Sequence, residues 1–182
     1  MNDHNFSYWR KVLWQLDTYP EIRKYCDGAA FHYYDGSPED IDNVCLKYPE
    51  LEYHFTEGGP RLYDNYATDW CKWGIVISKA LKHGCATFTG WNLMLDEIGG
   101  PNIGPFFCGG LVTRNSINGE LSYSGQYRAF GHFSKFIKRD AEIFPAATSK
   151  KGSSLFAFPD EEKPAEICAA LNPDGKFILT VT

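Results

Sequence analysis

The pattern of apolar and polar residues predicts three strands in the first hundred residues of the chain. Residues 28–34, GAAFHYY, form a continuous apolar and aromatic run, which is typical of a strand buried on both faces. Residues 51–55, LEYHF, alternate in polarity and lead into Glu57, which predicts a second strand that ends at this carboxylate. A third strand is predicted in residues 85–92, CATFTGWN.

Two helices are predicted before the second strand. Residues 6–16 have apolar positions at helical spacing, and Ser7 is the expected N-cap. Ser37 and Pro38, followed by two acidic residues, predict the start of a helix that continues to about Lys47. Helices between strands indicate a parallel α/β arrangement.

Two further helices are predicted after the second strand. One helix covers residues 69–84, and a glycine-rich loop at residues 97–110 separates the third strand from the other, at about residues 127–138. We interpret the apolar face of the first as packing against the sheet. This face consists of Trp70, Trp73, Ile77 and Leu81.

The pattern changes after about Ala141, where short β-like runs replace the helices. These runs lie at residues 153–160, 165–171 and 176–182. The sequence NPDGK between the last two is typical of a tight β-hairpin turn. The tail is therefore expected to form antiparallel strands of a separate sheet.

Composition and charge exclude several classes of function. The formal net charge is −5 and no run of five basic residues occurs, so we expect no nucleic-acid partner. No apolar stretch is long enough to span a bilayer, and no export signal is readable, so the compartment of the parent stays open between secreted, lysosomal and cytosolic. The six cysteines include no C-x-x-C pair, which favours small buried thiols over a zinc site or a disulfide scaffold. We expect no metal and no cofactor.

Four motifs in this order resemble the C-terminal part of glycoside hydrolase family 30, the glucosylceramidase-type enzymes. They are FHYYDG, FTEGGPR, GWNLMLDEIGGPN and YRAFGHFSKFI. The resemblance implies an eight-stranded (β/α) barrel with an attached β-sandwich. Residues 1–140 would carry barrel strands six to eight, and residues 141–182 would belong to the sandwich. The implied activity is retaining cleavage of β-glycosidic bonds in a glycoside or glycolipid.

The resemblance also implies roles for four residues. Glu57 matches the nucleophile at the end of the seventh strand, and a retaining glycosidase needs an ionised carboxylate that attacks the anomeric carbon. His32 and Tyr34 match the residues beside the nucleophile, where a phenol can hydrogen-bond the carboxylate. Trp91 matches the indole on which the bound sugar rests, because an indole face suits the apolar face of a pyranose.

Other interpretations of these residues stay open from the local sequence. Glu57 could form a surface ion pair with Arg61, while His32, Tyr34 and Trp91 are equally compatible with packing roles. The acidic pair Asp96 and Glu97 is explained at least as well by turn capping. A noncatalytic carbohydrate-binding or interaction module, with Tyr33, Tyr34 and Trp91 as an aromatic platform, is the alternative function.

The chain departs from the family pattern at two places, and we expect it to lack the part of the family's barrel that carries the general acid. Gly90 replaces the acidic residue that precedes the tryptophan of the eighth strand in glucosylceramidases proper, and Gly58-Gly59 replaces small or cysteine residues found in many relatives.

Residues 1–5 would correspond to the exit of the fifth strand. The family's general acid follows an asparagine, and no Asn-Glu pair occurs in the sequence. We therefore expect a fragment that carries the nucleophile, lacks the general acid/base, is inactive alone, and is poorly soluble because of exposed apolar strand faces.

Overall fold

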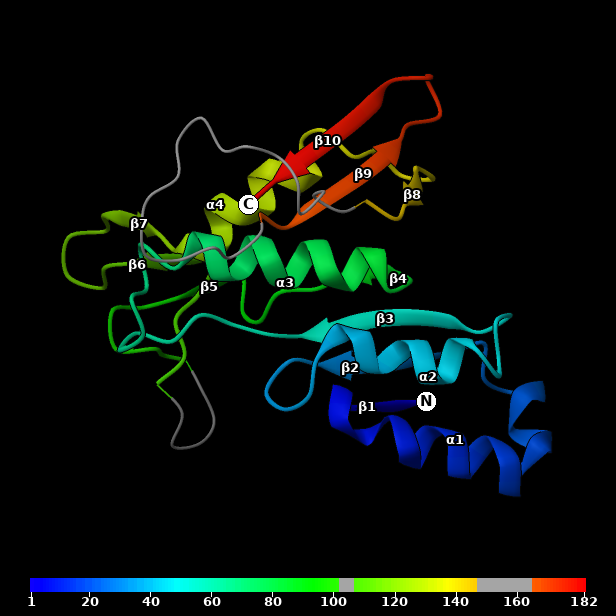
Figure 1. Ribbon diagram of the computed structural model, residues 1–182. Helices are drawn as coiled ribbons and strands as arrows, with labels where there is room; N and C mark the ends of the chain where they lie inside the picture. Colours follow the sequence, from blue (N-terminus) through cyan, green and yellow to red (C-terminus); the bar gives the residue numbers. More distant parts are fainter. Residues whose placement is uncertain (102–106, 147–164) are drawn as a thin grey trace, which may run out of the picture.

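A parallel sheet of four strands forms the centre of the protein (Figure 1). The computed structural model describes residues 1–101, 107–146 and 165–182. Within the sheet the strands lie in chain order, and each pairs in parallel with the next. They are β1 (Asn2–Asn5), β2 (Gly28–His32), β3 (Glu52–Glu57) and β4 (Cys85–Phe88). The predicted α/β class with a parallel sheet is confirmed, and the three predicted strands are β2, β3 and a β4 that ends before Trp91.

The helices begin and end close to the predicted positions, with one error in capping. A 3-10 turn precedes α1, so its N-cap is Tyr8 and the assignment of Ser7 was wrong. The Ser37 amide donates to the Asp40 carboxylate (3.0 Å), as expected for a helix start. The helical elements are η1 (Phe6–Tyr8), α1 (Trp9–Thr18), η2 (Pro20–Lys24), η3 (Pro38–Ile41), α2 (Asp42–Cys45), α3 (Trp70–Lys82) and α4 (Gly125–Ser134).

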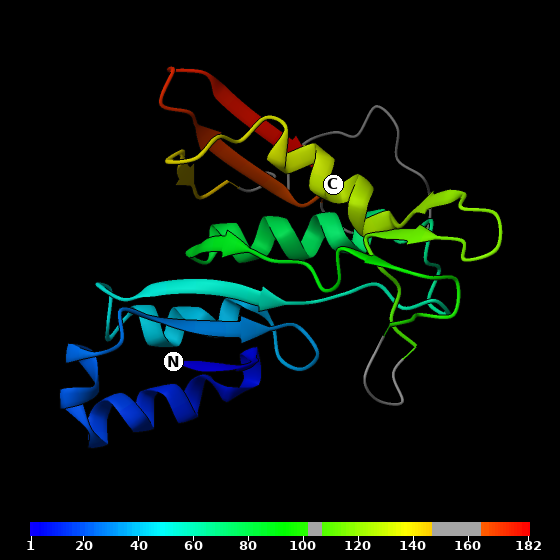
Figure 2. The ribbon, with the colours of Figure 1, turned by 180° about the vertical axis from the view of Figure 1, so that it is seen from behind.

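The two faces of the parallel sheet differ in what covers them. Ala29 and Phe31 of β2 and Tyr53 and Phe55 of β3 are buried on the face that α2 and α3 cover. Figure 2 shows the opposite face, over which no helix of the described residues lies. The expectation that residues 28–34 are buried on both faces was therefore wrong for this chain. The uncovered face is mostly polar and carries Ala30, His32, His54, Thr56 and Thr87.

Two small sheets complete the described fold. The first, absent from the sequence-based expectations, consists of β5 (Met94–Leu95), β6 (Val112–Arg114) and β7 (Leu121–Tyr123) between β4 and α4. The second consists of β8 (Glu142–Phe144), β9 (Ile167–Leu171) and β10 (Phe177–Val181). The last two strands form the predicted antiparallel hairpin, whereas β8 was not predicted and the run at residues 153–160 lies outside the described residues.

Helix α3 separates two hydrophobic cores. Its Ala80 contributes to the core between α1, α2 and the parallel sheet. On its other side, Trp73 and Ile77 are buried with α4 and with Cys168 of β9. Trp73 and Ile77 are therefore buried as predicted, but they pack mainly against α4 and β9 and not in the core of the parallel sheet, and Trp70 is 43% exposed.

The described residues show no helix that is both long and apolar enough to cross a membrane. All six cysteines are free, but only two of them are buried as the composition suggested. Cys85 and Cys168 are buried, whereas Cys71 lies exposed on α3.

Candidate active site

A β-bulge decides which face of the sheet Glu57 occupies. Strict alternation along β3 would place Glu57 on the same face as Tyr53 and Phe55, inside the core. Phe31 pairs with Phe55, but the next pair joins His32 to Glu57, so Thr56 is an extra residue on β3. A bulge of this kind re-aims the side chain that follows it. The Glu57 side chain is 27% exposed and lies beside His32 at the C-terminal end of the sheet.

Two of the predicted site residues contact the Glu57 carboxylate. The Tyr34 hydroxyl donates a hydrogen bond to Glu57 Oε1 (3.1 Å). His32 Nδ1 lies 3.9 Å from the same oxygen, too far for a hydrogen bond, and the His32 side chain is only 12% exposed. The structure therefore brings Glu57, His32 and Tyr34 together, as the family resemblance implied for their positions.

Burial and charge keep Tyr34 in its protonated, donating form. Burial, reinforced by the neighbouring Glu57 carboxylate, raises the pKa of Tyr34 well above its ordinary value. A phenol that stays protonated at neutral pH remains a donor to an ionised carboxylate. Arg61 does not serve as the ion-pair partner considered for Glu57, because its guanidinium donates to the Tyr63 hydroxyl (2.6 Å) and lies over the Tyr34 ring.

Asp3 joins this group from the neighbouring strand and was not found from the sequence. Asp3 Oδ1 accepts a hydrogen bond from Thr56 Oγ1 (2.7 Å) and lies 3.0 Å from His32 Nε2. These bonds, first from Thr56 and then from His32, lower the pKa of Asp3 below its ordinary value. The carboxylate is therefore ionised at neutral pH and acts as an acceptor for both partners.

Trp91 is joined to the same region through its backbone. It lies three residues beyond β4, and its amide donates to the carbonyl of Gly58 (3.0 Å), the residue after Glu57. A Cβ on Gly59 would lie 1.9 Å from the Trp91 carbonyl oxygen, so only glycine permits this approach. The side chain of Trp91 is 44% exposed, which leaves its indole accessible.

Gln126 holds the loop that follows Glu57, and its role was also not predicted from the sequence. Its side chain is fully buried, and Nε2 donates to the Gly58 carbonyl (2.8 Å). A Cβ on Gly90 would meet Gln126 Oε1, Leu111 and Phe130 at about 3 Å. A side chain at position 90 would therefore point into packed side chains in this protein.

The acidic pair in the following loop has a structural role. The Asp96 carboxylate accepts hydrogen bonds from the amides of Ile98 and Gly100, and Glu97 accepts from Ser116. The turn-capping interpretation of Asp96 is thus confirmed. No group of three or more potential metal-ligating side chains occurs among the described residues.

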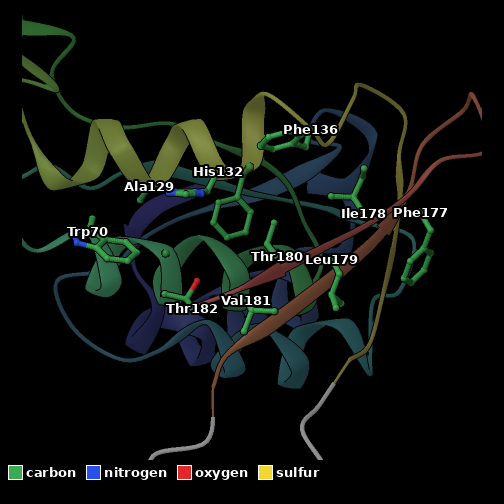
Figure 3. A pocket seen from close by; sticks show the side chains of 12 residues that line it. Trp70, Ala129, His132, Phe136, Phe177, Ile178, Leu179, Thr180, Val181 and Thr182 are labelled. Atoms are coloured by element: carbon green, nitrogen blue, oxygen red, sulfur yellow. The ribbon is translucent and has the colours of Figure 1, made fainter. Parts of the chain in front are cut away.

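A groove of about 350 Å³ lies elsewhere, between α3, α4 and β10 (Figure 3). Trp70, His132 and Phe136 line it together with the side chains of β10. None of the four predicted site residues contributes to it. The Trp70 and His132 rings stack with centroids 6.1 Å apart, so Trp70 faces α4 at the groove.

Two curated proteins of Caenorhabditis elegans are similar in sequence to this chain. Putative glucosylceramidase 3 is 31% identical over 129 residues, which make up 66% of this chain and 25% of that protein. Putative glucosylceramidase 4 is 25% identical over 153 residues, 75% of this chain and 28% of that protein. The chain thus spans about a quarter of the length of these relatives.

Solved structures show the same fold over nearly the whole chain, although no protein-family model matches it. The endo-β1,6-glucanase BT3312 superposes with a TM-score of 0.79 at 23% identity, over 98% of this chain and 40% of that one. SrfJ from Salmonella typhimurium gives a TM-score of 0.80 at 23% identity, over 98% and 38% of the two chains. At this identity the likeness concerns the fold alone. The curated relatives, however, confirm the resemblance drawn from the motifs: the chain is homologous to the glucosylceramidase-type proteins of glycoside hydrolase family 30.

Proposed function

We propose that these residues carry the nucleophile side of a retaining β-glycosidase that acts on a β-linked glycoside or glycolipid. Glu57 is the nucleophile, Tyr34 donates a hydrogen bond to its carboxylate, His32 lies beside it, and Trp91 supports the sugar ring. The observation that carries the proposal is the hydrogen bond from Tyr34 to Glu57 at the end of a parallel strand.

The chemistry of this arrangement suits covalent catalysis. A nucleophilic carboxylate must be ionised and aimed at the anomeric carbon, and a neutral donor fixes its direction without removing its charge. Tyr34 meets this need because a phenol is protonated at neutral pH, and its surroundings raise its pKa further. The backbone amide of Trp91 bonds Gly58, the residue after Glu57, and the indole is exposed. Trp91 is therefore close enough to contact a sugar bound at Glu57.

The proposed architecture follows from the same relationship. Residues 1–140 form part of a (β/α) barrel in which β2, β3 and β4 are strands six to eight, and residues 141–182 form part of a β-sandwich. The order of parallel strands supports this assignment, and so does the face of the sheet that no described helix covers, because in a closed barrel the inner face of each strand is covered by the side chains of the other strands. The second carboxyl group of a retaining glycosidase is not among the residues that we assign.

Covalent labelling tests the role of Glu57 directly. A 2-fluoroglycoside with an activated leaving group needs little protonation, so it forms a glycosyl adduct without a general acid. We expect intact mass measurement and peptide mapping to show one adduct on Glu57. Glu57→Gln should show none, and an adduct on another residue, or none on the wild-type chain, would contradict the proposal.

A noncatalytic carbohydrate-binding module is the second candidate. The exposed aromatic side chains of Tyr34 and Trp91 favour it. Tyr33, considered earlier for such a platform, is instead packed against Trp73, with ring centroids 4.9 Å apart. Sugar-dependent quenching of tryptophan fluorescence that persists in Glu57→Gln, without labelling of the wild-type chain, would favour this function.

A further inference from the structure

Two bulged residues lie on either side of His32 and contact each other. Asn2 pairs with Ala30 and His4 pairs with Phe31, so Asp3 is an extra residue on β1. Thr56 is the extra residue on β3. The hydrogen bond from Thr56 Oγ1 to Asp3 Oδ1 therefore joins the first and third strands across the end of the second.

The backbone of Asp3 is specialised for this contact. Asp3 has a φ of 73°, in the left-handed region that aspartate and asparagine tolerate better than most residues. The bulge turns its carboxylate toward β2 and β3, although 68% of the side chain is exposed. A solvated carboxylate does not require an unusual backbone conformation. We therefore interpret the bulge as the feature that directs Asp3 to its two hydrogen-bond partners, Thr56 and His32.

The contact with Asp3 determines how His32 faces Glu57. An ionised carboxylate only accepts hydrogen bonds, so His32 Nε2 must carry a proton to bond it. In the neutral ring this leaves Nδ1, the nitrogen nearest Glu57, without a proton. The fixed ring then forms one wall beside the carboxylate, while the Tyr34 hydroxyl is the donor to Glu57.

We infer that Asp3 is a positioning residue for the nucleophile: by bonding Thr56 and His32 with one oxygen, it fixes the bulge before Glu57 and the tautomer and orientation of the ring beside it. This inference rests on the proposed function of Glu57. Asp3 touches no reacting atom, and it acts through the two residues that border the carboxylate.

Two variants of the full chain test the inference, with a matched control. Asp3→Gly removes the carboxylate and tolerates the positive φ, whereas Asp3→Asn keeps an acceptor oxygen of the same shape. Asp140→Gly is the control, because Asp140 is an exposed aspartate with a φ of 63° between α4 and β8. The ring ¹⁵N shifts of His32, assigned with His32→Gln, report the tautomer at about pH 8.5, where unperturbed histidines are neutral.

We expect the wild-type chain to show the Nε2–H tautomer of His32 and Asp3→Gly to lose that preference. Labelling of Glu57 by the activated 2-fluoroglycoside should slow about ten- to a hundred-fold in Asp3→Gly, because a misplaced nucleophile loses that much. Asp3→Asn should lie between the two, and Asp140→Gly should match the wild type. Unchanged His32 shifts in Asp3→Gly, or changed shifts with an unchanged labelling rate, would overturn the inference. If no variant were labelled, the wild type included, the proposed function would fail instead, and the His32 shifts would decide only whether Asp3 fixes the ring of His32.

Discussion

At the scale of single residues, the Glu57 carboxylate depends on a neutral donor more than on a cation. Its closest partner is the Tyr34 hydroxyl, and the nearby Arg61 guanidinium is directed to Tyr63 instead. A cation bonded directly to a carboxylate would stabilise its charge and weaken its attack on carbon. A phenol orients the oxygen while leaving its charge available.

Tyr34→Phe removes only this hydrogen bond. Without this bond the Glu57 carboxylate is no longer held in one direction, and a nucleophile misplaced by about 1 Å can lose about a hundred-fold in rate, so labelling of Glu57 by the 2-fluoroglycoside should slow about ten- to a hundred-fold. The matched control is Tyr63→Phe, which removes a hydroxyl bonded to Arg61 and not to Glu57. Equal labelling rates in the two variants would show that the bond from Tyr34 does not orient the nucleophile.

The sequence predicted part of this site and not the rest. Glu57, His32 and Tyr34 stand at the ends of recognisable strands, so their meeting at one edge of a parallel sheet follows from strand order. Asp3 and Thr56 could not be found in this way, because a bulge arises from how a strand pairs with its neighbours. Local alternation alone would have turned Glu57 into the core.

At the scale of elements, a half-exposed ion pair links the helical turn η3 to α3. Lys79 Nζ lies 2.6 Å from Glu39 Oε1. Burial raises the pKa of Glu39, but hydrogen bonds from Lys79 and Ser37 outweigh it and bring the pKa to about 2. A carboxylate whose pKa is lower in the folded state stabilises the fold above its unfolded pKa, and this contribution is lost as the pH falls toward the folded value.

Glu39→Gln should therefore reduce stability at neutral pH and not at strongly acidic pH. Because both side chains are partly exposed, the loss at pH 7 should be about 0.5–1 kcal/mol. The difference from the wild type should shrink as the pH falls from about 4.5 toward 2, measured as denaturant midpoints across that range. Glu21→Gln, an exposed position in η2, is the control. A difference independent of pH would refute the assignment to ionised Glu39.

Helices, strands and turns were predicted correctly where the residues of a single element show a characteristic pattern. The spacing in α3, the alternation in β3 and the Asp-Gly turn between β9 and β10 each predicted what the structure has. The sheet of β5, β6 and β7 escaped prediction because its strands have two or three residues each. Such strands are too short for any period, and they form only through pairing with one another.

At the scale of the whole molecule, the C-terminal strands share a core with the α/β layer. Cys168 of β9 is fully buried in the cluster that contains Trp73 and Ile77 of α3. Ser78 and Lys82 of α3 also bond the Glu166 carboxylate, which precedes β9. Since these contacts join the tail to the helix that covers the parallel sheet, we expect residues 165–182 and α3 to open together.

Cys168→Ser tests this coupling with a change of one atom. A buried hydroxyl costs about 1–3 kcal/mol, and because Thr180 lies beside this side chain as a hydrogen-bond partner, the free energy of unfolding should fall by an amount at the lower end, about 1 kcal/mol. Native-state hydrogen exchange should then accelerate by the same factor for amides of β9, β10 and the middle of α3, because opening of the tail uncovers Trp73. Cys71→Ser, on the exposed side of α3, should leave both regions unchanged. Faster exchange in β9 and β10 with full protection retained in α3 would mean that the tail folds as an independent unit, and that the interface is only a docking surface between two separately stable parts.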